Sequence, residues 1–109
     1  GGFMYAAAEL ATAVQHGINV VAVVLNNHRF GASNRDQRGR FHGRVIGTEL
    51  HNPDFVKLAR SFGARGIKAE TLDEVPSAIK RALAAKKPTL VEVEMPDLDP
   101  LYELQPPKR

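Results

Sequence analysis

The sequence predicts an α/β domain with a mostly parallel sheet flanked by helices. Short runs rich in β-branched apolar residues alternate along the chain with segments of helical spacing. A glycine or a proline separates each helical segment from the run that follows it. Because helices that alternate with strands connect parallel strands, we expect one parallel sheet with right-handed crossovers.

The first helix is expected over 4–16, where alanines are abundant and apolar residues recur at helical spacing. Gly17 stands where a glycine cap ends a helix. The run 19–25 is apolar from its second residue onward and rich in valine, which is typical of a strand buried on both faces.

A second helix is expected to begin at Pro53 with Asn52 as its cap, and to end at Gly63. Asn52 and the proline have the order that favours a helix start. A short strand over 64–69 follows it.

Thr71 and Glu74 have the spacing of a capping box, which predicts a third helix that ends before Pro88. Residues 89–94 then mix apolar residues with two glutamates, so we expect a last strand nearer an edge of the sheet. We assign 1–95 to one domain and 96–109, with its four prolines, to an extended tail.

The segment 26–52 shows no periodicity, and we expect it to be an irregular connection that is either functional or mobile. Its positive charge is concentrated between Arg29 and Arg44, where there is a single acid, Asp36, and five arginines: Arg29, Arg35, Arg38, Arg40 and Arg44. Such a cluster can meet nucleic acid, an acidic substrate, a partner subunit or water. Few aromatic residues accompany it, so we expect no nucleic-acid partner and favour a solvated loop.

Composition narrows the class of protein further. The chain has 109 residues, of which 43% are hydrophobic and 25% charged, as in one globular domain. No run reaches the roughly 18–20 apolar residues of a membrane helix, and the N-terminus lacks the pattern of a secretory signal. The chain has no cysteine, which fits a reducing compartment, and we expect a cytoplasmic location without membrane binding.

Two features could hold a phosphorylated ligand. The pair Gly1-Gly2 at a helix start lets backbone N–H groups approach a phosphate, although such pairs also start many ordinary helices. Asn26 and Asn27 follow a buried strand at its carboxyl end, where ligands bind in open α/β sheets. Amide oxygens suit magnesium, but asparagine also favours turns, so position alone leaves both interpretations open.

Together the two features resemble the thiamine diphosphate motif, in which Gly-Asp-Gly is followed further along the chain by Asn-Asn. The chain resembles the acetolactate synthase and benzoylformate decarboxylase group of thiamine diphosphate enzymes. The likeness is strong over 1–37 and looser beyond. It rests on Gly-Gly-Phe at 1–3, Glu-Leu-Ala-Thr-Ala at 9–13, Leu-Asn-Asn at 25–27, Phe-Gly at 30–31 and the stretch 52–63.

The resemblance implies a partial thiamine diphosphate-binding domain, the C-terminal one of such an enzyme, which begins at the last glycine of Gly-Asp-Gly. Gly1 would be that glycine, and the ligating aspartate of the motif would lie directly before it. Gly2 and Phe3 would then offer backbone contacts to the diphosphate. Asn27 would give magnesium its side-chain oxygen, and Arg29 its backbone carbonyl.

Gly31 would belong to the cofactor-binding set, and Ala32 and Gln37 could line a substrate pocket with it. No catalytic residue is expected in this chain, because the family's activating glutamate belongs to a pyrimidine-binding domain. Glu9 is therefore given a structural role. The histidines lack the spacing of a zinc site, and His28 is best explained as a loop residue; they are His16, His28, His42 and His51.

The resemblance thus implies the cofactor-anchoring part of a thiamine diphosphate- and magnesium-dependent lyase or carboligase acting on 2-keto acids. Its partners would be the pyrimidine-binding domain of a partner subunit and further copies in a homo-oligomer. The alternative is a catalytically silent α/β fragment that acts only as an association or binding module. A dinucleotide-binding domain is excluded, because no G-x-G-x-x-G follows a strand and no acidic residue ends the strand at Leu25.

Overall fold

The computed structural model describes residues 2–97, and these fall into two compact units. The sheet unit comprises 2–26 and 52–95. The loop unit comprises 27–51 together with Pro96 and Asp97. The elements are η1 (Gly2–Tyr5), α1 (Glu9–Gln15), β1 (Val21–Asn26), α2 (Gly31–Arg40), α3 (Phe55–Ser61), β2 (Arg65–Ala69), η2 (Leu72–Glu74), α4 (Val75–Ala84) and β3 (Thr89–Glu94).

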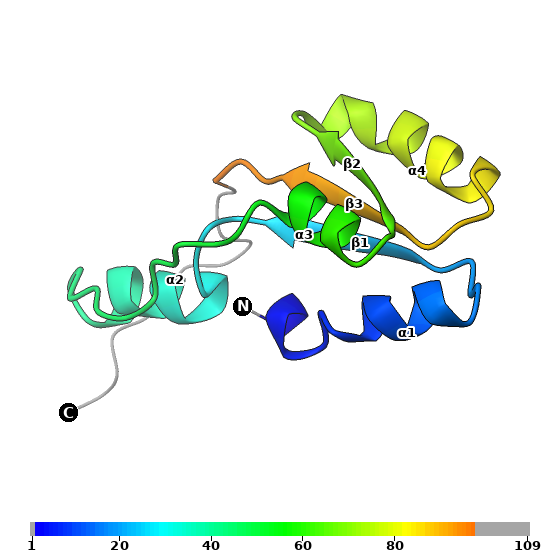
Figure 1. Ribbon diagram of the computed structural model, residues 1–109. Helices are drawn as coiled ribbons and strands as arrows, with labels where there is room; N and C mark the ends of the chain where they lie inside the picture. Colours follow the sequence, from blue (N-terminus) through cyan, green and yellow to red (C-terminus); the bar gives the residue numbers. More distant parts are fainter. Residues whose placement is uncertain (1, 98–109) are drawn as a thin grey trace. The chain divides into compact units, whose positions relative to one another are not determined.

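The sheet unit is built on three parallel strands in the order β1-β3-β2 (Figure 1). Thr89 of β3 lies opposite Val21 of β1 on one side and Arg65 of β2 on the other. Parallel strands joined through helices confirm the predicted α/β class.

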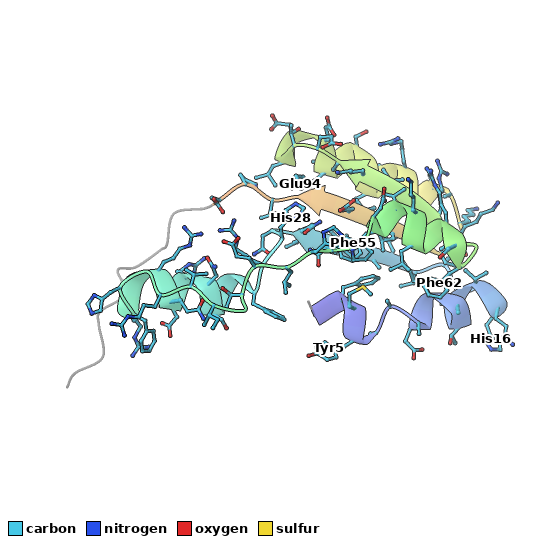
Figure 2. The ribbon with its side chains drawn as sticks, turned by 60° about the vertical axis from the view of Figure 1, so that its left-hand side comes forward. Tyr5, His16, His28, Phe55, Phe62 and Glu94 are labelled. Carbon is cyan, nitrogen blue, oxygen red and sulfur yellow. The ribbon has the colours of Figure 1, made fainter. Side chains whose placement is uncertain are left out.

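Successive residues of β3 face opposite layers of helices. Leu90 packs into one cluster with residues of α1 and α3, which are Leu10, Phe55 and Ala59. Val91 and Val93 pack into the other with residues of α4, which are Ala78 and Ala82. Tyr5 and His16 lie outside these clusters and point away from the sheet (Figure 2).

Gly66 allows α3 to lie close to β2. A Cβ atom built on Gly66 would lie 2.8 Å from both the Cγ1 and the carbonyl oxygen of Val56. Only a residue without a side chain fits there, so this glycine fixes the distance between a helix and the sheet that it covers.

The predicted helix over 4–16 begins later than expected. A 3₁₀ turn occupies Gly2–Tyr5, and the α-helix starts only at Glu9. Its end agrees with the prediction: Gly17 has a φ of +63°, and the N–H groups of Gly17 and Ile18 donate to the carbonyls of Val14 and Ala13. This is the bonding pattern of a glycine-capped helix terminus.

The expected positions of two strands in the sheet were wrong. β3 is central, with all but its last residue buried, whereas the glutamates had suggested an edge. Within the described residues β1 pairs only with β3, and its Val23 and Leu25 are exposed although burial on both faces was expected. Strand order depends on pairing between distant segments, which the local pattern does not contain.

The starts of the later helices also differ from prediction. Asp54, not Asn52, caps α3: its side chain accepts a hydrogen bond from the Lys57 N–H at 3.0 Å. Before α4, Thr71 makes no side-chain cap, and Glu74 instead accepts from the Glu70 N–H at 2.8 Å. α3 ends at Ser61, and Gly63, the residue predicted to stop it, follows the Phe62 cap with a φ of +88°.

The loop unit contains a helix that the sequence did not predict. α2 covers ten residues of the segment expected to be irregular. Its only buried residue is the polar Asn34, so the helix has no apolar face that periodicity could reveal. Side-chain hydrogen bonds hold it instead, as described below.

The tail predicted over 96–109 falls mostly on 98–109, outside the described residues. Within 2–97, no helix is both long enough and apolar enough to cross a membrane.

Candidate metal and diphosphate site

Asn26, the last residue of β1, and Asn27, which follows the strand, have different environments. Asn26 is buried, with 4% of its surface exposed, and its Nδ2 donates to the Glu92 carboxylate at 3.0 Å. Its Oδ1 accepts from the Asn52 side chain at 2.9 Å. Asn27 is exposed. Only the second asparagine of the pair therefore has a side chain that a ligand can reach.

A tight turn follows within the loop unit. The Asn27 Oδ1 accepts a long hydrogen bond of 3.4 Å from the Arg29 N–H. His28, between them, has a φ of +59°, which is unusual for a residue with a side chain. An asparagine side chain that accepts from the N–H two residues on forms an Asx turn, which sets the direction of the side-chain oxygen.

The backbone of Arg29 faces the same side as that oxygen. Arg29 is bridged to Glu49 in an antiparallel pair, flanked by the bonds Leu50 N–H to His28 O and Phe30 N–H to Thr48 O, both 2.8 Å. In this arrangement Arg29 and Glu49 form the non-hydrogen-bonded pair, so the N–H and C=O of Arg29 point away from 48–50. The Asn27 Oδ1, which meets that N–H, and the Arg29 carbonyl thus lie on one side of the turn.

Gly31 makes room for the Asn27 side chain. A Cβ atom on Gly31 would lie 2.6 Å from the Asn27 Nδ2, closer than van der Waals contact allows. Any larger residue at 31 would displace the amide. The turn therefore brings together three of the residues selected from sequence, namely Asn27, Arg29 and Gly31.

The Arg29 guanidinium takes no part in this arrangement of oxygens. One of its terminal nitrogens pairs with the Asp97 carboxylate at 3.2 Å, while its buried Nε lacks a hydrogen-bond partner within the described residues. The charge of the arginine is thus directed to Asp97. This leaves the backbone carbonyl as the group that Arg29 can offer a cation.

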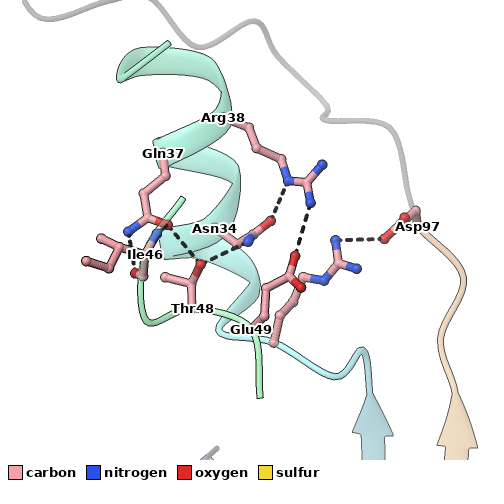
Figure 3. Close-up of polar contacts among 8 residues, drawn as sticks. Asn34, Gln37, Arg38, Ile46, Thr48, Glu49 and Asp97 are labelled. Atoms are coloured by element: carbon pink, nitrogen blue, oxygen red, sulfur yellow. Dashed lines mark hydrogen bonds and ion pairs between the residues drawn. The ribbon is translucent and has the colours of Figure 1, made fainter. Parts of the chain in front are cut away.

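Polar side chains hold α2 against the returning chain (Figure 3). The Asn34 Nδ2 donates to the Thr48 hydroxyl at 2.9 Å, and that hydroxyl donates to the Gln37 Oε1 at 2.8 Å. The Gln37 amide also bonds both backbone polar groups of Ile46. These contacts give Gln37 a structural role, and its expected substrate contact, like that of Ala32, stays a prediction.

Arg38 adds two further contacts to this network. Its Nε donates to the Asn34 Oδ1 at 2.8 Å, and its guanidinium pairs with the Glu49 carboxylate at 3.3 Å. Arg40 pairs with Asp36 one helical turn away. Part of the arginine cluster therefore stabilises the loop unit itself.

Gly2 and Phe3, which were expected to contact the diphosphate through their backbone, belong to the sheet unit. Gly2 is exposed, and a Cβ built on it would meet no atom within 4 Å. The Phe3 ring packs edge-on against Phe55, with 5.7 Å between ring centroids, which leaves only its backbone for a ligand. Gly1 lies outside the described residues.

Carboxylates and histidines offer no alternative metal site in this part of the chain: within 2–97, no group of three or more His, Cys, Asp or Glu side chains could hold an ion. Glu9 lies exposed in the first turn of α1, where a carboxylate suits the helix dipole. The sequence interpretation missed Asn52 and Glu92, since their contacts with Asn26 join residues far apart in the chain.

The two oxygen atoms of the turn fit a hard divalent cation. A side-chain amide oxygen and a backbone carbonyl are oxygen ligands of the kind that magnesium accepts, and they leave positions for phosphate oxygens and water. Comparison with known proteins identifies the family of the chain and, with it, the cofactor class. The family model of the C-terminal thiamine pyrophosphate-binding domain of thiamine pyrophosphate enzymes matches residues 1–93. The chain belongs to this family.

Several thiamine pyrophosphate enzymes are similar to the chain in sequence. It is 39% identical over 99 residues to the acetolactate synthase large subunit of Haemophilus influenzae, covering 89% of this chain and 17% of that protein. It is 32% identical over 97 residues to the sulfoacetaldehyde acetyltransferase of Castellaniella defragrans, with coverages of 85% and 16%. The chain therefore spans about a sixth of the length of these relatives.

Solved structures show the same fold. The benzoylformate decarboxylase of Polynucleobacter necessarius superposes with a TM-score of 0.77 at 30% identity, over 91% of this chain and 19% of that one. The thiamine diphosphate-dependent 4-hydroxybenzoylformate decarboxylase of Rhodococcus jostii gives 0.76 at 37% identity, over 84% and 18%. Thiamine pyrophosphate and thiamine diphosphate are names of one molecule, so sequence and fold agree on the cofactor class.

Proposed function

We propose that this chain anchors thiamine diphosphate through a magnesium ion, as the cofactor-holding part of a lyase or carboligase that acts on 2-keto acids. The observation that carries the proposal is the turn at 27–31. The Asn27 side-chain oxygen and the Arg29 backbone carbonyl lie on one side of this turn. Gly31 has no side chain, which leaves room for the Asn27 amide.

In this proposal Asn27 and Arg29 each give the metal one oxygen, and the metal holds the diphosphate. The backbone at Gly2 and Phe3 contributes N–H groups to phosphate oxygens. When bound, thiamine diphosphate supplies a carbanion that attacks a keto carbonyl and stores the resulting negative charge. The residues of this chain bind and orient; the remaining ligand and the activating carboxylate come from other parts of the enzyme.

The substrate class follows from the relatives less directly than the cofactor does. Two similar solved structures are decarboxylases of benzoylformate and 4-hydroxybenzoylformate, which are 2-keto acids, whereas another relative is a sulfoacetaldehyde acetyltransferase. We accordingly assign a 2-keto acid substrate, a pyrimidine-binding domain from a partner subunit and a homo-oligomeric assembly to the complete protein as proposals.

Calorimetric titration of the complete gene product with thiamine diphosphate tests the metal anchor. We expect binding in the presence of magnesium, loss of binding on chelation, and loss of binding in Asn27→Ala. Asn19→Ala is the matched control, because Asn19 is exposed and lies just before β1 rather than after it. Magnesium-independent binding, or an unchanged affinity in Asn27→Ala, would refute the proposal.

A second candidate function is association without catalysis. Val23 and Leu25 of β1 are exposed, with 42% and 62% of their surfaces accessible, and within 2–97 this strand pairs on one side only. Unpaired strand edges favour association. Size-exclusion chromatography of the 109-residue chain distinguishes the outcomes: association is expected, and a clean monomer would argue against it. Turnover of pyruvate or benzoylformate by this chain alone would contradict catalytic silence.

A further inference from the structure

Three side chains of the sheet unit, two of them buried, form a hydrogen-bonded chain at the end of β1. The Asn52 Nδ2 donates to the Asn26 Oδ1 at 2.9 Å, and the Asn26 Nδ2 donates to the Glu92 Oε1 at 3.0 Å. Both Asn26 and Glu92 are only 4% exposed. A carboxylate only accepts hydrogen bonds, and the Asn52 NH₂ only donates them. The Asn26 NH₂ group must therefore point to Glu92 and the Asn26 oxygen to Asn52.

The backbone of Asn26 is held as well. Its carbonyl oxygen accepts from the Met95 N–H at 2.9 Å, just beyond the end of β3. The last residue of β1 is therefore fixed through its main chain and through both ends of its side chain. The residue that follows it directly in sequence is Asn27.

Burial of the Glu92 carboxylate and the Asn26 amide is energetically costly. A carboxylate and an amide lose hydration inside a protein, and an apolar pair of similar size would cost less at this position. Such polar networks are retained where they specify one conformation, since every partner must be in place for all of them to be satisfied. Asn52 lies 26 residues from Asn26 and Glu92 lies 66 residues away, so the network joins three distant segments at one point.

We propose that Glu92 and Asn52 are positioning residues for the metal-binding Asn27, and that they act by fixing Asn26. This inference rests on the proposed function, because it assigns a purpose to the network only if Asn27 binds the metal. A metal ligand must be held within a few tenths of an ångström, and groups that orient ligands affect metal affinity without touching the ion.

The test measures the Kd for thiamine diphosphate in magnesium, together with the unfolding midpoint, on the complete gene product. Glu92→Leu and Asn52→Ala are each expected to weaken binding by about 10–100-fold. Glu92→Gln is expected to retain most of the affinity, because its amide oxygen can still accept from Asn26. Asn52 is only partly buried, so its variant tests the inference if Glu92→Leu fails to fold.

Val91→Ala is the control for a loss of stability alone. Val91 precedes Glu92 in β3, is completely buried, and packs in the opposite cluster with residues of α4. We expect it to lower the unfolding midpoint and leave the Kd unchanged. A ligand-free readout is amide exchange at Met95, which should become faster in Asn52→Ala and Glu92→Leu and stay slow in Glu92→Gln.

Two results would overturn the inference. In the first, Asn52→Ala and Glu92→Leu bind as tightly as the wild type while Asn27→Ala does not bind. In the second, Glu92→Gln binds as weakly as Glu92→Leu, which would show that hydrogen bonding to Asn26 is not what matters. Failure of the wild type to bind would refute the proposed function itself, so the two failures are distinguishable.

Discussion

In the variant Gly31→Ala, a new methyl group would stand where the Asn27 amide now lies. The distance from the new Cβ to the Asn27 Nδ2 would be 2.6 Å, and ordinary contact begins at 3.4 Å, so the amide must retreat by about 0.8 Å. Magnesium–oxygen distances are about 2.0–2.1 Å and tolerate only about 0.2 Å. The required movement is several times larger than that tolerance, so we expect the affinity for magnesium and thiamine diphosphate to fall about 10–100-fold.

Stability should change little in the same variant. The clashing atom is the end of an exposed side chain, which can turn away, and Gly31 does not have a positive φ. Alanine at the start of α2 also lowers the entropy of the unfolded chain, so the free energy of unfolding should stay within about 1 kcal/mol of wild type. Calorimetric titration and urea unfolding of the complete gene product measure the two quantities.

Gly66, in the sheet unit, should respond to substitution in the opposite way to Gly31. In Gly66→Ala the new Cβ would meet the backbone of Val56, which cannot turn away, so we expect a loss of about 1–3 kcal/mol in stability with unchanged affinity in the folded protein. Wild-type affinity in Gly31→Ala would refute the role given to the space beside Asn27. Equal losses of affinity in both variants would show that general destabilisation explains the effect.

Three further substitutions test the packing and the turn. Leu90→Ala removes a completely buried side chain and should cost about 2–5 kcal/mol in urea unfolding; a smaller loss would contradict the assignment of the core. His28→Val places a β-branched residue at a φ of +59° and should cost about 1–2 kcal/mol, with a smaller loss in His28→Gly; equal losses would argue against backbone strain. Asn34→Leu removes the bonds to Thr48 and Arg38, costs about 1–3 kcal/mol, and should accelerate amide exchange throughout α2; unchanged exchange would mean that the polar contacts do not hold the helix.

The sequence predicted those parts of the fold that depend on local chemistry. The strands β1 and β3 follow from short runs rich in β-branched residues, and the glycines at 17 and 63 end helices because they adopt a positive φ. The metal-binding candidates came from the resemblance to the thiamine diphosphate motif, and their metal binding stays a prediction; the structure shows that Asn27, Arg29 and Gly31 belong to one turn of five consecutive residues.

The features that prediction missed depend on contacts between distant residues. α2 is held by Asn34, Gln37 and Arg38 through polar partners further along the chain, so it has no periodic apolar face. Glu92 suggested an edge strand because its partner Asn26, 66 residues away, is not visible in the local pattern. Asp54 caps α3 in place of the predicted Asn52, because the Asn52 side chain is hydrogen-bonded to Asn26.

A crystal structure of the complete gene product with thiamine diphosphate and magnesium tests the central claim most directly. We expect the metal to lie about 2.0–2.1 Å from both the Asn27 Oδ1 and the Arg29 carbonyl oxygen, with phosphate oxygens completing its coordination. A magnesium–diphosphate pair bound without either of these two oxygens would contradict the account.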